Sequence, residues 1–333
     1  MPRSPYKGSE TTSPWAELQT AVDLCWKAPL SLKLLRIGYL LGLVLGSALF
    51  VWNPLIRTLT LAAQNDEYTH ILLILPLTLA LIYIQRKSLG SLFELDVLNG
   101  SFILCVAAVA AGLARSQATR MTADLQLSIK MLALVTWWIG SFVLCFGSRI
   151  SRSLIFPLCF LYLMVPLPSF VLNYIIKYLQ HWSAVVTRVL FTTAGVPVSQ
   201  DGLQLSIPGL TVEIAKECSS IRSSLILLVT TMVLSQLLMH STWRKALVVM
   251  LALPLSVAKN GLRIFTIAML GTRVDPGFLN GNLHRNGGIV FFAIALGVIF
   301  ILLWILNRTH DGMTRAAVVR PPDPETLTMV NSR

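Results

Sequence analysis

The segment EIAKECSSIRSS, residues 213–224, places a cysteine, a glutamate and an arginine directly before a long apolar run. A cysteine at the start of a helix lies near unpaired backbone N–H groups and the positive end of the helix dipole, and both favour the nucleophilic thiolate. Arg222, four residues after Cys218, would share its helix face and favour the thiolate further. The alternative is an ordinary capping segment with an incidental cysteine, in which Glu217 forms a structural ion pair with Arg222 or Lys216.

Two later segments add an arginine and a histidine. Arg263 lies within the apolar run KNGLRIFTIAML (259–270), where a guanidinium costs about 2.5–3.5 kcal/mol and usually faces a polar cavity or a partner. His284 lies in GNLHRNGGIVFF (281–292), where the last apolar run begins. A thiolate that attacks a carbonyl, an imidazole that moves protons and a guanidinium that stabilises an oxyanion together suit acyl transfer. A structural ion pair for Arg263 and an interfacial position for His284 are the alternatives.

Other kinds of chemistry are not indicated by the sequence. His70, in DEYTHILLILPL (66–77), fits an interface anchor or a group that supports a site. The five cysteines have no metal-like spacing, and the chain contains no HExxH, GxSxG or P-loop pattern. We therefore expect neither a metal site nor a cofactor.

The composition indicates a membrane protein. Of the 333 residues, 55% are hydrophobic and 13% are charged, whereas soluble domains have about 25% charged residues. Several apolar runs approach the ~20 residues that a helix needs to cross a bilayer. The net charge of +12 comes largely from basic residues that flank these runs, which is typical of membrane topology signals and not of nucleic-acid binding. The sequence thus predicts an all-α polytopic membrane protein.

We predict about eight transmembrane helices, one interfacial or re-entrant helix and a short β-hairpin. The helix at 169–193 has apolar residues at helical spacing with polar interruptions, which favours an interfacial position, and a ninth span is the alternative. Between 201 and 216 apolar and polar residues alternate around a Pro-Gly turn, which predicts the hairpin. The predicted spans are 37–53, 71–85, 98–114, 131–147, 153–168, 219–239, 246–271 and 287–306.

The basic residues orient these spans. The clusters of basic residues all fall on the cytoplasmic side only if 169–193 does not cross the membrane. In that topology the hairpin, the start of the helix at Ser219 and the loop 272–286 face outward. The predicted organisation is a cytoplasmic N-terminal segment at 1–36, a membrane-embedded domain at 37–306 and a polar cytoplasmic tail at 307–333.

At the reactive segments the sequence resembles the exosortase/archaeosortase family of membrane cysteine transpeptidases. KECSSIRSS (216–224) is similar to the family's cysteine motif, usually (A/E)CSGIR, with Ser220 in place of the common glycine. KNGLRI (259–264) resembles the family's NxxR segment, with Asn260 and Arg263 in the matching positions.

Two more segments extend the resemblance over most of 37–306. LHRNGG (283–288) resembles the third motif, with His284 in the basic position. DEYTHILLILP (66–76) is similar to an upstream Y(S/T)HGxxxP segment but lacks its glycine.

The resemblance implies an enzyme, a membrane cysteine transpeptidase or endopeptidase of the bacterial inner membrane. Its substrates would be C-terminal sorting tails of exported proteins, made of a Pro-Glu-Pro-like (PEP-CTERM) motif, a transmembrane helix and a basic cluster. Cleavage would occur on the outer, periplasmic face, and the acyl group would pass to an unidentified amine, glycan or lipid acceptor. Such enzymes are often encoded beside exopolysaccharide genes.

The resemblance also implies roles for individual residues. Cys218 would be the nucleophile, Arg263 the oxyanion stabiliser and His284 the general acid/base. Arg222 would tune the thiol or bind the acidic residue of the sorting signal. The residues expected to support the site or to bind substrate are Glu217, Asn260 and His70.

Two other function classes fit the sequence. One is a noncatalytic membrane protein of exopolysaccharide assembly or transport, in which Arg263 and Lys259 bind an anionic lipid or a sugar phosphate. The other is an intramembrane protease that releases its product to water.

Overall fold

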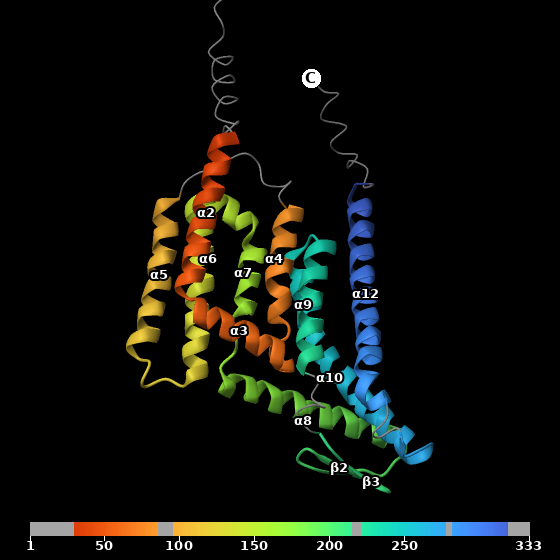
Figure 1. Ribbon diagram of the computed structural model, residues 1–333. Helices are drawn as coiled ribbons and strands as arrows, with labels where there is room; N and C mark the ends of the chain where they lie inside the picture. The colour runs from red at the N-terminus through yellow and green to blue at the C-terminus, as the bar shows by residue number, and fades with distance from the viewer. Residues whose placement is uncertain (1–29, 86–95, 215–220, 278–281, 319–333) are drawn as a thin grey trace, which may run out of the picture. The chain divides into compact units, whose positions relative to one another are not determined.

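The computed structural model of the chain describes residues 30–85, 96–214, 221–277 and 282–318 (Figure 1). These residues form ten α-helices, two short 3₁₀ helices and one three-stranded sheet. Six helices are long and apolar enough to cross a membrane, and the number rises to eight if each of two bent helix pairs is one span. The chain is therefore a polytopic helical membrane protein, and the predicted fold class is confirmed.

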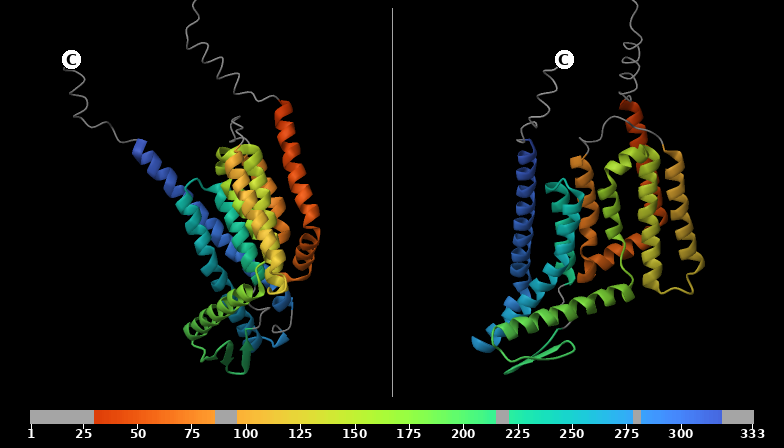
Figure 2. Two further views of the ribbon diagram at one scale, coloured as in Figure 1. Left: turned by 90° about the vertical axis from the view of Figure 1, so that its left-hand side faces the viewer. Right: turned by 180° about the vertical axis from the view of Figure 1, so that it is seen from behind.

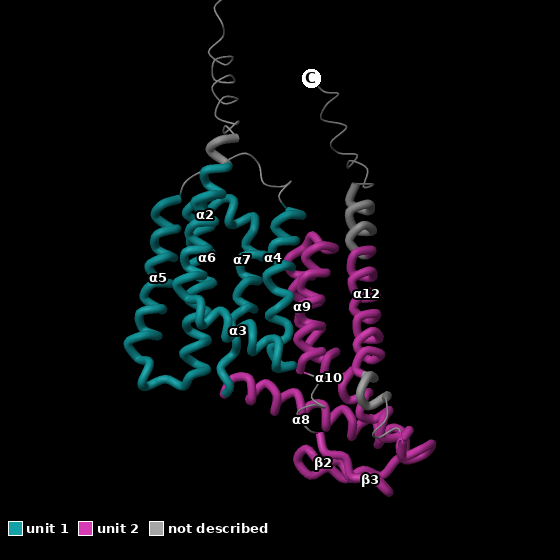
Figure 3. Tube along the Cα trace, viewed as in Figure 1, with its two compact units in different colours: residues 1–169 teal, residues 170–333 magenta. Residues whose placement is uncertain are grey.

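The chain divides into two compact units, residues 1–169 and 170–333, which are coloured separately in Figure 3. The boundary lies at the start of the helix that was predicted to be interfacial. The division into a terminal segment, a membrane domain and a tail stays a prediction.

Unit 1 begins with a helix pair that the sequence does not reveal. Helix α2 (Leu30–Phe50) and helix α3 (Trp52–Gln64) meet at an angle of 80°, so the chain turns sharply where the first predicted span ends. The elements that follow in unit 1 are η1 (Asp66–Tyr68), α4 (Ile71–Gln85), α5 (Val97–Ser116), α6 (Ala123–Ser153), α7 (Ile155–Phe160) and η3 (Leu161–Met164).

Helices α5 and α6 form a tightly packed antiparallel pair (Figure 2). The side chain of Asp96 caps α5 by accepting a hydrogen bond from the Asn99 backbone N–H at 3.1 Å, as expected for an N-cap aspartate. Gly100 permits the close approach, because a Cβ atom at this position would lie only 2.6 Å from the Cα of Leu144. This pair confirms the predicted span at 98–114.

The sequence predicts spans at 131–147 and 153–168; the first lies within the candidate membrane span Ala123–Ser153, and most of the second lies in a bent helix pair, Ile155–Met164 with Ser169–Thr193. Helix α6 runs through the first range to Ser153, with a break at Gly147, whose φ of 85° lies in the left-handed region that glycine readily adopts. The second range contains only α7 and η3, and this stretch, Ile155–Met164, is too short to cross a bilayer alone. The segment VPLPS that follows contains Pro166 and Pro168, which cannot continue the helix.

Helix α8 (Ser169–Thr193) lies at 97° to the α7–η3 stretch. Its buried residues recur at helical spacing, whereas aromatic side chains line its exposed surface. This amphipathic pattern agrees with an interfacial helix, although the absence of a crossing stays a prediction. The exposed aromatic residues are Phe170, Tyr174, Tyr178 and Trp182.

The predicted hairpin is present within a three-stranded antiparallel sheet of β1 (Ser199–Asp201), β2 (Gln204–Ile207) and β3 (Leu210–Glu213). Gly209, with a φ of 84°, forms the β2–β3 turn after Pro208. In Figure 1 the sheet lies along α8, on the side away from α9. Its contact with the helices is apolar: Leu205 of β2 packs in a cluster with Ala184 of α8.

Three long helices complete unit 2: α9 (Ile221–Leu238), α10 (Thr242–Arg273) and α12 (Asn282–Val318). They pack around a fully apolar cluster that includes Leu227, Val248 and Ile299, one residue from each helix. The candidate spans in these helices confirm the predicted spans at 219–239, 246–271 and 287–306.

The Gly100 contact can be tested by stability. We expect Gly100→Ala to lower the free energy of unfolding by about 1–3 kcal/mol, because the new methyl group must displace the α6 backbone. Gly112→Ala, on the same helix, is the control, since a Cβ there meets no atom within 4 Å. Thermal unfolding of both variants in detergent would show a loss for the first only. Equal effects would contradict the close packing.

Candidate functional site

Most residues predicted for the site belong to unit 2. Cys218 and Glu217 lie outside the described residues, and helix α9 begins at Ile221, three positions after the cysteine. Arg222 is exposed in the first turn of α9. His284 lies in the first turn of α12, where only the backbone is described.

Helix α10 carries three of the polar residues near the middle of its length. Lys259 and Asn260 are buried, with 6% and 1% of their surfaces exposed, and Arg263 is partly buried one turn after Lys259. Two cations four residues apart on one helix repel each other, so this face favours an anionic partner. Such a surface can stabilise negative charge that develops during a reaction or that a ligand carries.

Asn260 connects α10 to α8. Its Nδ2 donates a hydrogen bond to the Ser183 hydroxyl at 3.0 Å, and its Oδ1 is buried with no hydrogen-bond partner among the described residues. The helices approach closely here, because a Cβ atom on Gly261 would lie 2.6 Å from the Val186 side chain. The Thr187 hydroxyl lies 3.3 Å from the Gly261 carbonyl oxygen. Asn260 is therefore held in a rigid α8–α10 contact.

Gln180 of α8 anchors the chain immediately before the cysteine segment. Its side chain is 6% exposed, and its Nε2 donates to the carbonyl oxygen of Ile214 at 2.8 Å. Ile214 is the last described residue before 215–220, the segment that contains Cys218. Gln180 thus ties the backbone at Ile214, directly before that segment, to α8.

Two serines anchor the chain after the cysteine segment. The Lys259 ammonium donates to the Ser223 hydroxyl, and the Ser256 hydroxyl donates to that of Ser224. Both contacts join the first turn of α9 to α10. Buried polar side chains therefore hold described residues on both sides of the cysteine segment, Ile214 before it and Ser223 and Ser224 after it, and Lys259 links α9 to α10.

Gln180, Ser223, Ser224 and Ser256 are not among the residues predicted for the site. A signal for Gln180 exists, since Gln180, Ser183 and Thr187 recur at spacings of three and four within an apolar helix. That spacing puts three polar groups on one helix face, which is costly unless they have partners. The serines give no comparable signal, because a hydroxyl can also bond to its own helix.

His70 belongs to unit 1 and lies between η1 and α4, partly buried. Nearby, the Tyr68 hydroxyl donates to the Leu167 carbonyl oxygen at 3.0 Å, which joins this segment to the chain before α8. His70 thus belongs to a different unit from the α9–α10 residues. Its role at the site stays a prediction.

Comparison with known proteins gives one match. The sequence model of a family described as "Transmembrane exosortase (Exosortase_EpsH)" matches residues 58–301, which is more than half of the 333-residue chain. The matched range includes every residue predicted for the site. Neither the curated proteins nor the solved structures contain a significant match.

The Gln180 anchor makes a stability prediction. Gln180→Leu would leave the buried Ile214 carbonyl without its donor, so we expect a loss of about 1–3 kcal/mol in the free energy of unfolding. Gln200→Leu is the matched control, because Gln200 donates to the Gly202 carbonyl at an exposed position. Its effect should stay within about 0.5 kcal/mol. Similar melting temperatures for both variants would show that the buried bond contributes no stability.

Proposed function

Because the chain belongs to the exosortase family of transmembrane proteins, we propose that it is a cysteine transpeptidase that cleaves C-terminal sorting signals of exported proteins. The proposed signals are of the PEP-CTERM type. The acyl group of the cleaved protein passes to an acceptor of the amine, glycan or lipid class.

The observation that carries this proposal is the pair of hydrogen bonds to described residues on either side of the cysteine segment, Ile214 before it and Ser223 after it. Gln180 holds the backbone at Ile214, and Lys259 holds Ser223 in the first turn of α9. A nucleophile must be kept within a fraction of an ångström of its productive position by surrounding contacts. The hydrogen bonds at Ile214 and Ser223, on either side of residues 215–220, are contacts of this supporting kind.

In the proposed reaction the Cys218 thiolate attacks the carbonyl carbon of the scissile peptide bond. Arg263 stabilises the negative oxygen of the tetrahedral intermediate. The C–N bond then breaks, and His284 donates a proton to the leaving amine, which departs with the membrane-anchored tail. The acceptor attacks the resulting thioester, His284 takes its proton, and the Cys218 thiolate is restored.

The remaining predicted residues assist these steps. Arg222, exposed in the first turn of α9, tunes the thiol or binds the acidic residue of the sorting signal. Asn260 is positioned by Ser183 beside the cationic face of α10 and orients substrate or Arg263. Glu217 and His70 contribute to substrate binding.

The proposed location is the bacterial inner membrane, with the site facing the periplasm. A sorting tail would place its scissile bond just outside its own transmembrane helix. A cysteine at the outer end of α9 could therefore meet that bond while both partners stay in the plane of the membrane. This geometry explains why a reactive polar segment precedes an apolar helix.

A processing assay tests the proposal. A tagged exported protein with a PEP-type tail from the same organism is followed by electrophoretic mobility in cells that carry wild type or Cys218→Ala. We expect the tail to be lost with wild type only, since alanine supplies no nucleophile. Cys105→Ala, a change of an exposed cysteine on α5, is the control and should process normally. Equal processing by wild type and Cys218→Ala would exclude the cysteine mechanism.

The two cations on α10 also fit the alternative function, a noncatalytic protein of exopolysaccharide assembly or transport that binds an anionic lipid or sugar phosphate. The variants separate the two functions. As a transpeptidase the protein loses function with either Cys218→Ala or Arg263→Ala, whereas as a transport protein it tolerates the first and not the second. A protease that releases its product to water would process the tail without forming a product joined to an acceptor.

A further inference from the structure

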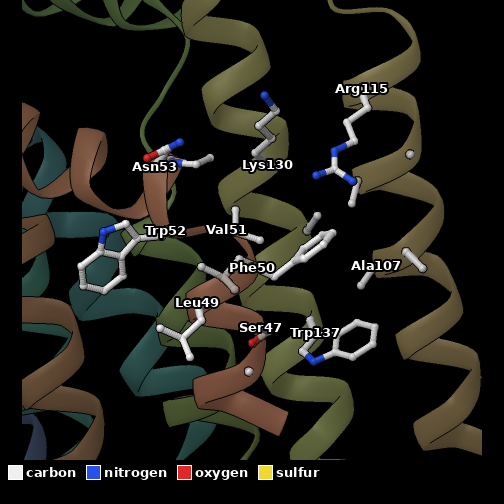
Figure 4. Close-up of a pocket in the computed structure, with 17 residues that line it drawn as sticks. Ser47, Leu49, Phe50, Val51, Trp52, Asn53, Ala107, Arg115, Lys130 and Trp137 are labelled. Atoms are coloured by element: carbon white, nitrogen blue, oxygen red, sulfur yellow. The ribbon is translucent and has the colours of Figure 1, made fainter.

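A cavity of about 700 Å³ lies within unit 1, and no residue of the proposed reaction lines it (Figure 4). It is lined by the end of α2, the α2–α3 bend, α5 and α6. Helices α2 and α5 both pack on α6, and the cavity occupies space beside all three. Small residues on α5 make the room: Ala107, Ala108, Ala111 and Gly112 all line it.

One end of the cavity carries two positive charges. Figure 4 shows Arg115 on α5 and Lys130 on α6 at the same end, with Phe50 and Trp137 further along. The Arg115 guanidinium lies 4.8 Å from the centre of the Phe50 ring. Neither cation forms an ion pair or a side-chain hydrogen bond within the described part of the chain, and the residues that line the cavity there include no acidic side chain.

A third polar group lies beside the cavity. The indole Nε1 of Trp137, which lines the cavity, is buried and has no hydrogen-bond partner among the described residues. The neighbouring Trp138 is satisfied, since its Nε1 donates to the Ser47 hydroxyl at 3.1 Å.

These features together describe an amphiphilic ligand. The volume is within the range of about 300–1,000 Å³ that is usual for ligand pockets. A free inorganic anion would use the cationic end and leave the alanine-lined part empty. A neutral lipid chain would fill the apolar part and leave both cations without an anionic partner.

We propose that this cavity binds an anionic membrane lipid, with the headgroup phosphate held by Arg115 and Lys130 and an acyl chain along the small residues of α5. The predicted topology supports this assignment, because it places the α5–α6 connection on the outer side, where lysine and arginine are uncommon. Binding of an anionic headgroup accounts for Arg115 and Lys130 on the outer side. The inference does not depend on the proposed transpeptidase activity.

Lipid retention by the full-length chain tests the proposal. The protein is purified in detergent with an equimolar mixture of phosphatidylglycerol and phosphatidylcholine, and the bound lipid is measured by native mass spectrometry. We expect wild type to retain phosphatidylglycerol selectively. The double variant R115Q/K130Q should lose this selectivity by about tenfold or more, because two charged donors to the phosphate are removed. Equal retention by wild type and the double variant would overturn the proposal.

Arg120→Gln is the matched charge control, because Arg120 lies in the α5–α6 connection and does not line the cavity. It should retain phosphatidylglycerol as wild type does. If Arg120→Gln also loses selectivity, overall surface charge and not the cavity accounts for the lipid binding, and the proposal is overturned.

Two further measurements separate the sources of the phosphate and guard against misfolding. Ala111→Phe fills the apolar part and keeps both cations, so it should also lose bound lipid while its melting temperature shows a folded protein. Retained lipid in this variant would contradict binding in the cavity.

Inorganic phosphate at millimolar concentration should not displace the lipid from wild type, and full displacement would identify a free anion as the ligand instead.

Discussion

Polar groups inside an apolar helical protein must find partners, and this requirement organises unit 2. A buried hydrogen-bonding group without a partner costs several kcal/mol in an apolar environment. The Gln180 amide, the Nδ2 group of Asn260 and the Lys259 ammonium each find a partner on a different neighbour: the carbonyl that follows β3, a serine on α8 and a serine on α9. These bonds join α8, α9, α10 and the chain after the sheet, where apolar contacts alone would allow the helices to slide. The cysteine segment lies between two of these contacts.

Most membrane-spanning helices could be predicted in number and position, because a hydropathy profile detects apolar runs that are long enough to cross a bilayer. The hairpin could be predicted because a Pro-Gly pair and alternating residues require a turn between strands. The angle at which one helix follows the previous one has no comparable signal in the sequence. The 80° turn between α2 and α3 and the break at Gly147 depend on packing and on one left-handed residue, so the sequence did not reveal them.

The candidate site could be predicted only in part, because some residue types are unusual in an apolar run and others are common there. Lys259, Asn260 and Arg263 were noticeable because charged and amide groups are rare in apolar runs. The braces formed by Ser223, Ser224 and Ser256 were not, since serine is common in membrane helices and its partner is known only from the fold. Whether Cys218, Arg263 and His284 meet at one point stays a prediction, because the segment with Cys218 and the side chain of His284 lie outside the described residues.

The exposed aromatic side chains of α8, such as Tyr174 and Trp182, have a consequence for how deep unit 2 lies in a bilayer. Aromatic rings prefer the headgroup level, so a helix that carries a row of them stays with the water boundary. Gln180 links this helix directly to the chain that leads into the cysteine segment. In a thicker or thinner bilayer, hydrophobic mismatch would be absorbed by tilting of the long helices. Ile214, which Gln180 ties to α8, would keep its depth relative to the headgroups and would follow the membrane surface, not the membrane centre.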